Sequence, residues 1–275
     1  MLKPNIYGVQ GAKKAGFDNI YSMVEGTGDV FINNGIKWKL IRKVVCMGYK
    51  KAFKNSKKVF FLNNDDKAEF IRRGLVKDGQ CEIVHGIGVD LDRFEHQPVE
   101  NTTTFLMIAR LLRTKGVFEY CEAAKMVKEK YPNAVFNIVG PEGTIKAEDI
   151  KEYTENGIIN YLGETNDVRP FIKESSVYVL PSYREGFSVS IMEAQATGRA
   201  VITCDTNGTR DTVIEGYNGF LVPVGDSHAI AEKMIYFLEH PETIDPMGKN
   251  AREYSERMFD HRVINEKICN MIGVN

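Results

Sequence analysis

From residue 101 onward, short apolar segments alternate with longer segments in which apolar residues recur at helical spacing. This alternation predicts β-α units, and β-α units in series pack into a parallel sheet with helices on its faces. The expected strands are 104–109, 134–139, 158–162, 177–180, 200–203 and 219–222. The expected helices are 116–130, 167–174, 188–197 and 227–239. The second part of the chain is therefore expected to be a doubly wound α/β domain.

A shorter version of the same alternation precedes residue 85. The expected strands are 20–24, 59–62 and 82–84, and the expected helices are 35–53 and 65–72. Residues 86–101 are rich in Gly, Asp, Pro and polar side chains, which favours a linker. For a chain of 275 residues we expect two Rossmann-like domains, an incomplete one at 1–90 and a complete one at 91–255. A C-terminal helix at 256–275 is expected to pack back on the first domain.

The composition of the chain indicates its cellular compartment and the kind of partner it suits. Its five cysteines are scattered and form no Cys-x-x-Cys pair, so neither a disulfide framework nor a zinc site is indicated, and a reducing cytoplasm is expected. No apolar run reaches the roughly 18 residues that a spanning helix needs. Residues 1–60 carry twelve Lys and Arg against three acidic residues, so this segment is suited to an anionic partner.

One strand-turn-helix segment concentrates the polar chemistry. The buried-strand pattern at 177–180 is followed by a polar turn at 181–186 and by helical periodicity from 187 to 197. In an open parallel sheet, ligands bind beyond the carboxyl ends of the strands, and the N–H groups at a helix N-terminus bind anions. A diphosphate is therefore a suitable ligand for this turn.

Two carboxylates flank that helix start. Glu185 precedes the helix and Glu193 lies about two turns within it, so the two groups are separated by on the order of 10 Å. This spacing suits an extended nucleotide sugar, with Glu193 on the ribose, Glu185 on the sugar, and Gly186, Phe187 and Ser188 at the diphosphate. Taken alone, each carboxylate is more simply explained as a solvated group that stabilises the helix dipole.

Cationic groups are expected at the end of the first strand of the same domain. Arg110 and Lys115 follow the strand at 104–109 and precede the next helix. Side chains at this position project into the crevice beyond the sheet, where they can stabilise charge on a departing nucleoside diphosphate. Ordinary surface cations are the alternative interpretation of this pair.

Together these residues resemble the retaining glycosyltransferases of the GT-B fold, glycosyltransferase family 4. The resemblance rests on the Glu-x7-Glu element of Glu185 and Glu193 and on Arg110 with Lys115-Gly116. Supporting matches are Gly88-Val89-Asp90, Phe94, Gly140, Tyr161-Leu162-Gly163, Gly198, Val201 and Ile202. The resemblance implies that Arg110 and Lys115 contact the donor diphosphate, Glu185 the transferred sugar and Glu193 the ribose. It also places the base near Leu162.

The opening residues depart from this family pattern. Residues 3–8 resemble sequence about midway through the N-terminal domain of full-length relatives, so the early strands are expected to be missing. Three interpretations stay open: a truncated gene, a start codon assigned too far downstream, or a split enzyme with a second chain. Loss of those strands would remove part of the acceptor site.

The resemblance implies a hexosyltransferase that moves a hexose or N-acetylhexosamine from a nucleotide sugar, expected to be a UDP-sugar. The expected acceptor is a saccharide or polyprenyl-linked saccharide in surface polysaccharide assembly. The alternatives are a non-catalytic nucleotide-sugar-binding fragment or subunit and a GT-B sugar-nucleotide epimerase. No cofactor, no metal and no nucleic acid partner are expected; Asp90 and Asp92 are interpreted as turn residues rather than metal ligands.

A basic amphipathic segment at 36–58 includes the only Trp of the chain, Trp38. Such a segment suits an anionic membrane surface. A domain helix with one buried face and a solvated lysine face explains the same pattern. The protein is accordingly expected in the cytoplasm, with peripheral attachment to the inner face of the cell membrane as one outcome.

Overall fold

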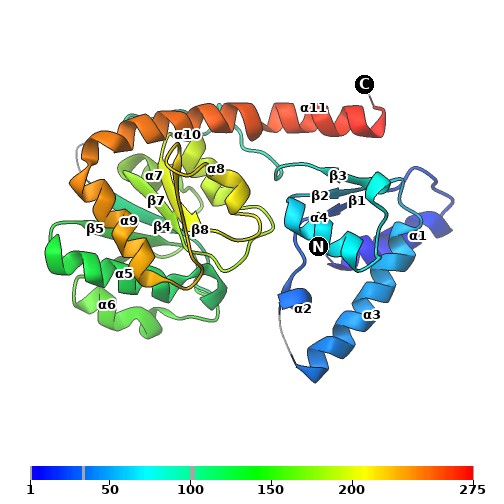
Figure 1. Ribbon diagram of the computed structural model, residues 1–275, viewed down its shortest axis with the longest axis horizontal. Helices are drawn as coiled ribbons and strands as arrows, with labels where there is room; N and C mark the ends of the chain where they lie inside the picture. The colour runs from blue at the N-terminus through cyan, green and yellow to red at the C-terminus, as the bar shows by residue number, and fades with distance from the viewer. Residues whose placement is uncertain (1, 33–34, 100–102, 275) are drawn as a thin grey trace. The chain divides into compact units, whose positions relative to one another are not determined.

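The computed structural model describes residues 2–32, 35–99 and 103–274, so the last two positions of the expected linker, 100 and 101, lie outside the described residues. The chain forms two compact units (Figure 1). Unit 1 comprises Met1–Ile87 and Arg262–Asn275, and unit 2 comprises Gly88–His261. The sequence placed the corresponding changes at 90 to 91 and 255 to 256.

Unit 1 is built on a parallel sheet with strand order β1-β2-β3. Tyr21 pairs with Lys58 where β1 and β2 begin. The elements of this unit are η1 (Pro4–Gly8), α1 (Val9–Lys14), β1 (Tyr21–Val24), α2 (Asp29–Ile32), α3 (Ile36–Phe53), β2 (Lys58–Phe61), α4 (Asn64–Arg72), η2 (Asp78–Gln80), β3 (Cys81–Ile83) and α11 (His261–Ile272).

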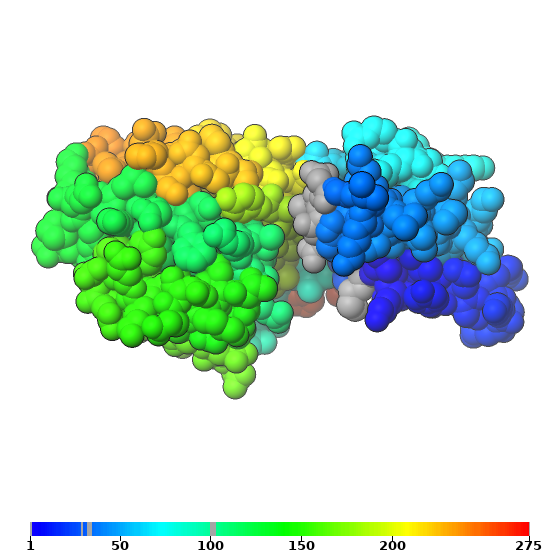
Figure 2. Space-filling model, turned by 90° about the horizontal axis from the view of Figure 1, so that it is seen from below, coloured from blue at the N-terminus to red at the C-terminus, as the bar shows by residue number. Residues whose placement is uncertain are grey.

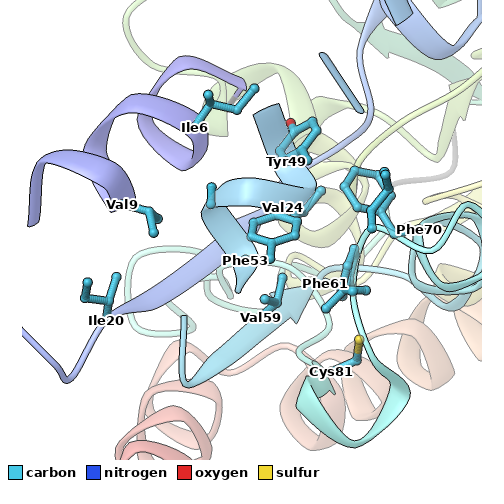
Figure 3. Packing of buried hydrophobic residues seen from close by; sticks show 13 residues of the cluster. Ile6, Val9, Ile20, Val24, Tyr49, Phe53, Val59, Phe61, Phe70 and Cys81 are labelled. Atoms are coloured by element: carbon cyan, nitrogen blue, oxygen red, sulfur yellow. The ribbon is translucent and has the colours of Figure 1, made fainter. Parts of the chain in front are cut away.

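An aromatic cluster forms the core of unit 1 (Figure 3). The ring of Phe70, on α4, lies 5.1 Å from that of Tyr49, 5.3 Å from that of Phe61 and 6.1 Å from that of Phe53. All four side chains are buried. Because these residues come from α3, β2 and α4, burial of their rings fixes both helices against the sheet. The first helices, η1 and α1, cover α3 through Ile6, which packs against Gly48.

Unit 2 contains six parallel strands in the order β6-β5-β4-β7-β8-β9. Helices α5 and α9 pack together, and α8 and α10 pack together with β8 (Figure 1). The elements are β4 (Thr104–Ile108), η3 (Arg113–Lys115), α5 (Val117–Lys130), β5 (Val135–Val139), η4 (Ala147–Ile150), α6 (Lys151–Glu155), β6 (Asn160–Tyr161), α7 (Arg169–Glu174), β7 (Val177–Leu180), α8 (Val189–Ala196), β8 (Ala200–Cys204), η5 (Arg210–Thr212), β9 (Gly219–Val222), α9 (Ser227–Glu239), η6 (Pro241–Thr243) and α10 (Ile244–Met258).

The order of these strands reverses between β4 and β7. The chain moves outward from β4 through β5 to β6, returns to β7 beside β4, and then moves outward through β8 to β9. Ligands of doubly wound sheets bind beyond the carboxyl ends of the two strands at such a switch point. The turns that follow Ile108 and Leu180 therefore lie where a ligand site is expected.

The α/β class with parallel sheets is confirmed, and every expected strand is present within two residues of its expected start and end. The edge strand β6 is the shortest of unit 2, with two residues. The helices η1, α1, α2 and α6 were not among those expected from the sequence. In α1 only Val9 is buried, so the segment lacks the wide apolar stripe by which an amphipathic helix is recognised.

Candidate functional site

The turns after β4 and β7 are locked together at Gly116. This residue has φ 74°, a left-handed conformation that glycine adopts readily. A Cβ atom at this position would collide with the carbonyl oxygen of Pro181. Next to this contact, the Tyr183 N–H donates to the Thr114 carbonyl at 2.9 Å. The close approach of the two turns brings Lys115 toward the segment that carries Glu185.

Lys115 and Glu185 form an ion pair at this point. The Lys115 Nζ lies 2.5 Å from Glu185 Oε1, and the Ser182 hydroxyl donates to the same oxygen at 2.7 Å. The Glu185 side chain is 11% exposed and that of Lys115 is 26% exposed, so the carboxylate is largely buried and the lysine is partly accessible to solvent. Among the described residues, none donates a hydrogen bond to Glu185 Oε2. Both hydrogen-bonding partners of the carboxylate thus lie on Oε1.

The turn after β8 contacts the backbone of Glu185. The Glu185 N–H donates to the Asn207 carbonyl at 3.0 Å. Gly208, at φ 76°, lies so close to the Glu185 carbonyl that any side chain would displace it. Ser182, Asn207 and Gly208 were missed by the sequence reasoning. The Asn-Gly pair after a strand was a usable signal, since it marks a tight turn.

Helix α8 begins at the end of this turn. The Ser188 hydroxyl caps it by accepting from the Ile191 N–H at 3.4 Å. Phe187 directs its ring into the core, 5.4 Å from the ring of Phe259, and is 7% exposed. The Phe187 ring is therefore part of the core of unit 2, and a role of its backbone toward a diphosphate stays a prediction. Gly186 is half-buried beside it.

Glu193 lies on the second turn of α8 and is half-buried. Burial raises the pKa of Glu193 to about 7, and the positive charge of Arg93 opposes this rise. The orientation of α8 depends on Tyr178, whose hydroxyl donates to the Ile108 carbonyl at 3.1 Å and forms a hydrogen bond of 2.7 Å with the Ser190 hydroxyl. Tyr178 thus ties α8 to the end of β4.

Arg110 and Leu162 lie at the ends of β4 and β6. Arg110 is exposed, and its Cγ packs beside Gly143 in the turn after β5. Leu162 is 44% exposed, although its N–H donates to the Ile138 carbonyl and continues the pairing with β5. All the residues predicted as site residues therefore belong to unit 2 and follow β4, β6 or β7, or lie on α8. Their roles toward a ligand stay predictions.

The Asp90 carboxylate has a local role. Its Oδ1 accepts from the N–H groups of Asp92 at 3.0 Å and Arg93 at 3.1 Å, which confirms the turn interpretation. Across residues 2–32, 35–99 and 103–274, no group of three His, Cys, Asp or Glu side chains is placed to hold a metal ion.

The model of the family described as glycosyl transferases group 1 matches residues 89–254, which covers nearly all of unit 2. The chain belongs to this family. The predicted enzyme class, a glycosyltransferase, is confirmed by this membership. In the same part of the chain lie Arg110, Lys115, Leu162 and the segment from Glu185 to Glu193.

Named relatives match over most of the chain. It is 30% identical to the N,N'-diacetylbacillosaminyl-diphospho-undecaprenol alpha-1,3-N-acetylgalactosaminyltransferase of Campylobacter jejuni, over 96% of this chain and 73% of that protein. It is 28% identical to the UDP-Gal:alpha-D-GlcNAc-diphosphoundecaprenol alpha-1,3-galactosyltransferase of Escherichia coli, over 91% of this chain and 67% of that protein. It spans 58% of the length of the capsular polysaccharide biosynthesis glycosyltransferase CapM of Staphylococcus aureus, at 27% identity.

Solved structures show the same fold. The crystal structure of HepE from Anabaena in complex with UDP superposes with a TM-score of 0.84 at 17% identity, covering 99% of this chain and 77% of that one. The GT-B type of fold expected from the sequence is confirmed. In the described parts of the chain, no helix combines the length and the apolar character required to cross a membrane.

Proposed function

We propose that the chain is a retaining glycosyltransferase that moves a hexose or N-acetylhexosamine from a UDP-sugar to a saccharide or polyprenyl-linked saccharide in surface polysaccharide assembly. The observation that carries the proposal is the Lys115–Glu185 pair at the switch point, where a cation for a diphosphate and a carboxylate for a sugar meet. The names of the two diphosphoundecaprenol-dependent relatives support the acceptor class.

The donor is proposed to lie along the carboxyl ends of β6, β4 and β7. The base packs on the exposed Leu162, the ribose hydroxyls donate to Glu193, and the diphosphate meets the first N–H groups of α8 together with Arg110 and Lys115. The sugar hydroxyls donate to Glu185, whose Oε2 accepts nothing from the described protein residues. Each part of a nucleotide sugar thus meets a group of suitable charge.

Transfer is proposed to proceed by same-face displacement. As the bond from the sugar to the diphosphate lengthens, negative charge accumulates on the departing phosphate, and Arg110 and Lys115 stabilise it. The departing phosphate oxygen accepts the proton of the acceptor hydroxyl. Glu185 already holds Lys115 in position, so little reorganisation is needed when the charge develops. We propose that neither a metal ion nor a cofactor takes part.

The surface of α3 supports a proposal of membrane attachment. Along one face of α3 lie Ile36, Leu40, Val44 and Met47, which are 89%, 66%, 59% and 57% exposed. This exposed apolar face is flanked by Lys37, Lys39 and Lys43, and α3 lies at the surface of unit 1 (Figure 2). An apolar face bordered by lysines suits the interface of an anionic membrane. We propose a cytoplasmic protein attached peripherally to the inner face of the cell membrane.

Calorimetry with UDP, combined with transfer and hydrolysis assays on UDP-sugars in the presence of membranes, tests the proposal. Binding of UDP together with transfer to a lipid-linked saccharide is the expected result. Binding without transfer or hydrolysis would identify a nucleotide-sugar-binding subunit that needs a further chain. Interconversion of UDP-sugars without an acceptor would identify an epimerase.

A further inference from the structure

Unit 1 contains a cavity of about 670 Å³ at the end of α3. It lies between the last turn of that helix, the turn into β2 and the segment that precedes β3. Its lining consists of Lys50, Phe53, Lys54, Lys57, Gly74, Leu75, Val76, Lys77, Gly79 and Gln80. The cavity belongs to a different unit from the candidate donor site and lies at the amino ends of β2 and β3.

The charge of the lining has one sign. Lys50, Lys54, Lys57 and Lys77 contribute four ammonium groups, and no carboxylate is among the described residues that line the cavity. Within the part of the chain that the structure describes, none of these four lysines has a carboxylate at ion-pair distance. The positive charge of Lys57 lowers the pKa of Asp18 only as a minor contribution, after Lys13, which lies 2.6 Å from that carboxylate.

The floor of the cavity is apolar. Phe53, Leu75 and Val76 are 1%, 4% and 8% exposed, whereas the four lysines are exposed at the rim. An anion that enters the cavity is in contact with this apolar surface on one side, where its attraction to the ammonium groups is less screened than in open water. An apolar floor with cationic walls is a suitable receptor for a group that carries both a phosphate and a less polar substituent.

The ordinary explanation for lysines at the end of a helix is their attraction to its last carbonyl groups. Here, however, the Gln80 side-chain amide donates to the carbonyls of Phe53 and Ser56. The Phe53 carbonyl of α3 is therefore already paired. Lys57 and Lys77 lie outside α3, so the helix dipole does not account for their place in the cluster.

We propose that this cavity, which we call the lysine pocket, binds a phosphate group. Two sources carry that chemistry, an anionic lipid headgroup and a soluble phosphate. The exposed apolar face of α3 runs from Ile36 to Met47 and leads along the same helix to Lys50 and Lys54, which makes a lipid headgroup the expected source. Only this choice of source rests on the proposed membrane attachment; the phosphate site itself does not depend on the donor site.

The first test uses the full chain with saturating UDP, so that the donor site is occupied, and titrates inorganic pyrophosphate by calorimetry. The pocket variant combines Lys54→Gln, Lys57→Gln and Lys77→Gln. Its matched control combines Lys3→Gln, Lys14→Gln and Lys125→Gln, three exposed lysines outside the cavity that give the same change in charge. We expect the pocket variant to lose at least about tenfold in affinity and the control at most about threefold, since distant exposed charges are screened.

The second test measures co-sedimentation with vesicles of phosphatidylcholine, with and without phosphatidylglycerol. Each lysine near an anionic surface contributes a factor of about five, so the pocket variant should bind the phosphatidylglycerol vesicles about 100-fold more weakly. Binding to pyrophosphate without any preference for phosphatidylglycerol would support the pocket and assign it to a soluble phosphate.

Equal losses in the pocket variant and the control would overturn the proposal, because the effect would then be general surface charge. So would the absence of binding to both pyrophosphate and phosphatidylglycerol in the unmodified chain. Thermal unfolding checks that both variants fold. UDP affinity, measured separately, shows whether the donor-site proposal holds independently of this result.

Discussion

Gly116 packs directly against the carbonyl of Pro181, and this contact joins the turns that follow β4 and β7. It explains how Lys115 and Glu185, seventy positions apart in the sequence, meet at 2.5 Å. A backbone contact of this kind sets the geometry of the ion pair before any ligand arrives.

Replacement of Gly116 by alanine should therefore lower both stability and activity. The new Cβ collides with Pro181 and is also strained at φ 74°, so we expect the free energy of unfolding to fall by about 2–4 kcal/mol. Urea unfolding measures this change. Gly11→Ala in α1, where a Cβ meets nothing within 4 Å, is the control and should be neutral or stabilising. Equal effects of the two substitutions would contradict the packing argument.

Substitution of Glu193 and of Glu185 should affect different properties, UDP affinity in the first case and turnover in the second. Glu193→Ala is expected to weaken UDP binding about tenfold or more, because the ribose hydroxyls lose their hydrogen-bond acceptor. Glu185→Ala should leave UDP affinity within about threefold and reduce turnover instead, because its proposed partner is the sugar. Calorimetry with UDP and steady-state kinetics distinguish the two. The same UDP affinity in both variants and the unmodified protein would remove the ribose role of Glu193.

The raised pKa of Glu193 predicts a pH dependence of stability. Its pKa of about 7 in the folded state exceeds the unfolded value of 4.5, so the folded state binds more protons between these values. Stability should consequently fall as pH rises from about 4.5 through 7, by up to about 3 kcal/mol. Urea unfolding from pH 5 to pH 8 should show this loss in the unmodified protein and not in Glu193→Gln. Parallel curves for the two proteins would show that Glu193 ionises normally.

Lys115 and Arg110 should matter most for the chemical step. Lys115→Met removes a cation from the departing diphosphate, for which a loss of about 10²–10³ in kcat is expected. Arg110→Met should act in the same direction. Lys125→Met, on the exposed surface of α5, is the control. An unchanged kcat in both site variants would exclude them from charge stabilisation.

The exposed apolar face of α3 provides a further test. Leu40→Glu combined with Val44→Glu places two charges where apolar side chains are 66% and 59% exposed, so folding should be unaffected. Vesicle binding should fall by about tenfold or more, because both apolar burial and attraction to anionic lipid are lost. Val135→Glu combined with Val224→Glu, at two exposed apolar side chains of unit 2, is the control with the same change in charge. Unchanged vesicle binding in the α3 variant would show that this face does not contact the membrane.

Local periodicity was sufficient to predict most strands and helices of both units. The buried run at 177–180 and the helix from 188 onward are examples, because side-chain alternation records which face of each element is covered. Periodicity failed for α1, where a single buried residue leaves no stripe to detect.

The sequence by itself determined the alternation of strands and helices and the residue types at the candidate site, from Arg110 to Glu193. Only the tertiary structure decided how those residues are held in place. Ser182 and Lys115 both contact one carboxylate oxygen of Glu185, and Asn207 and Gly208 pack against its backbone. The tertiary structure also decided the burial that shifts the pKa of Glu193 and the lysine pocket around Phe53. The physical reason is that hydrogen bonds, burial and electrostatic potential depend on residues that are distant in sequence, whereas periodicity reports only on neighbours along the chain.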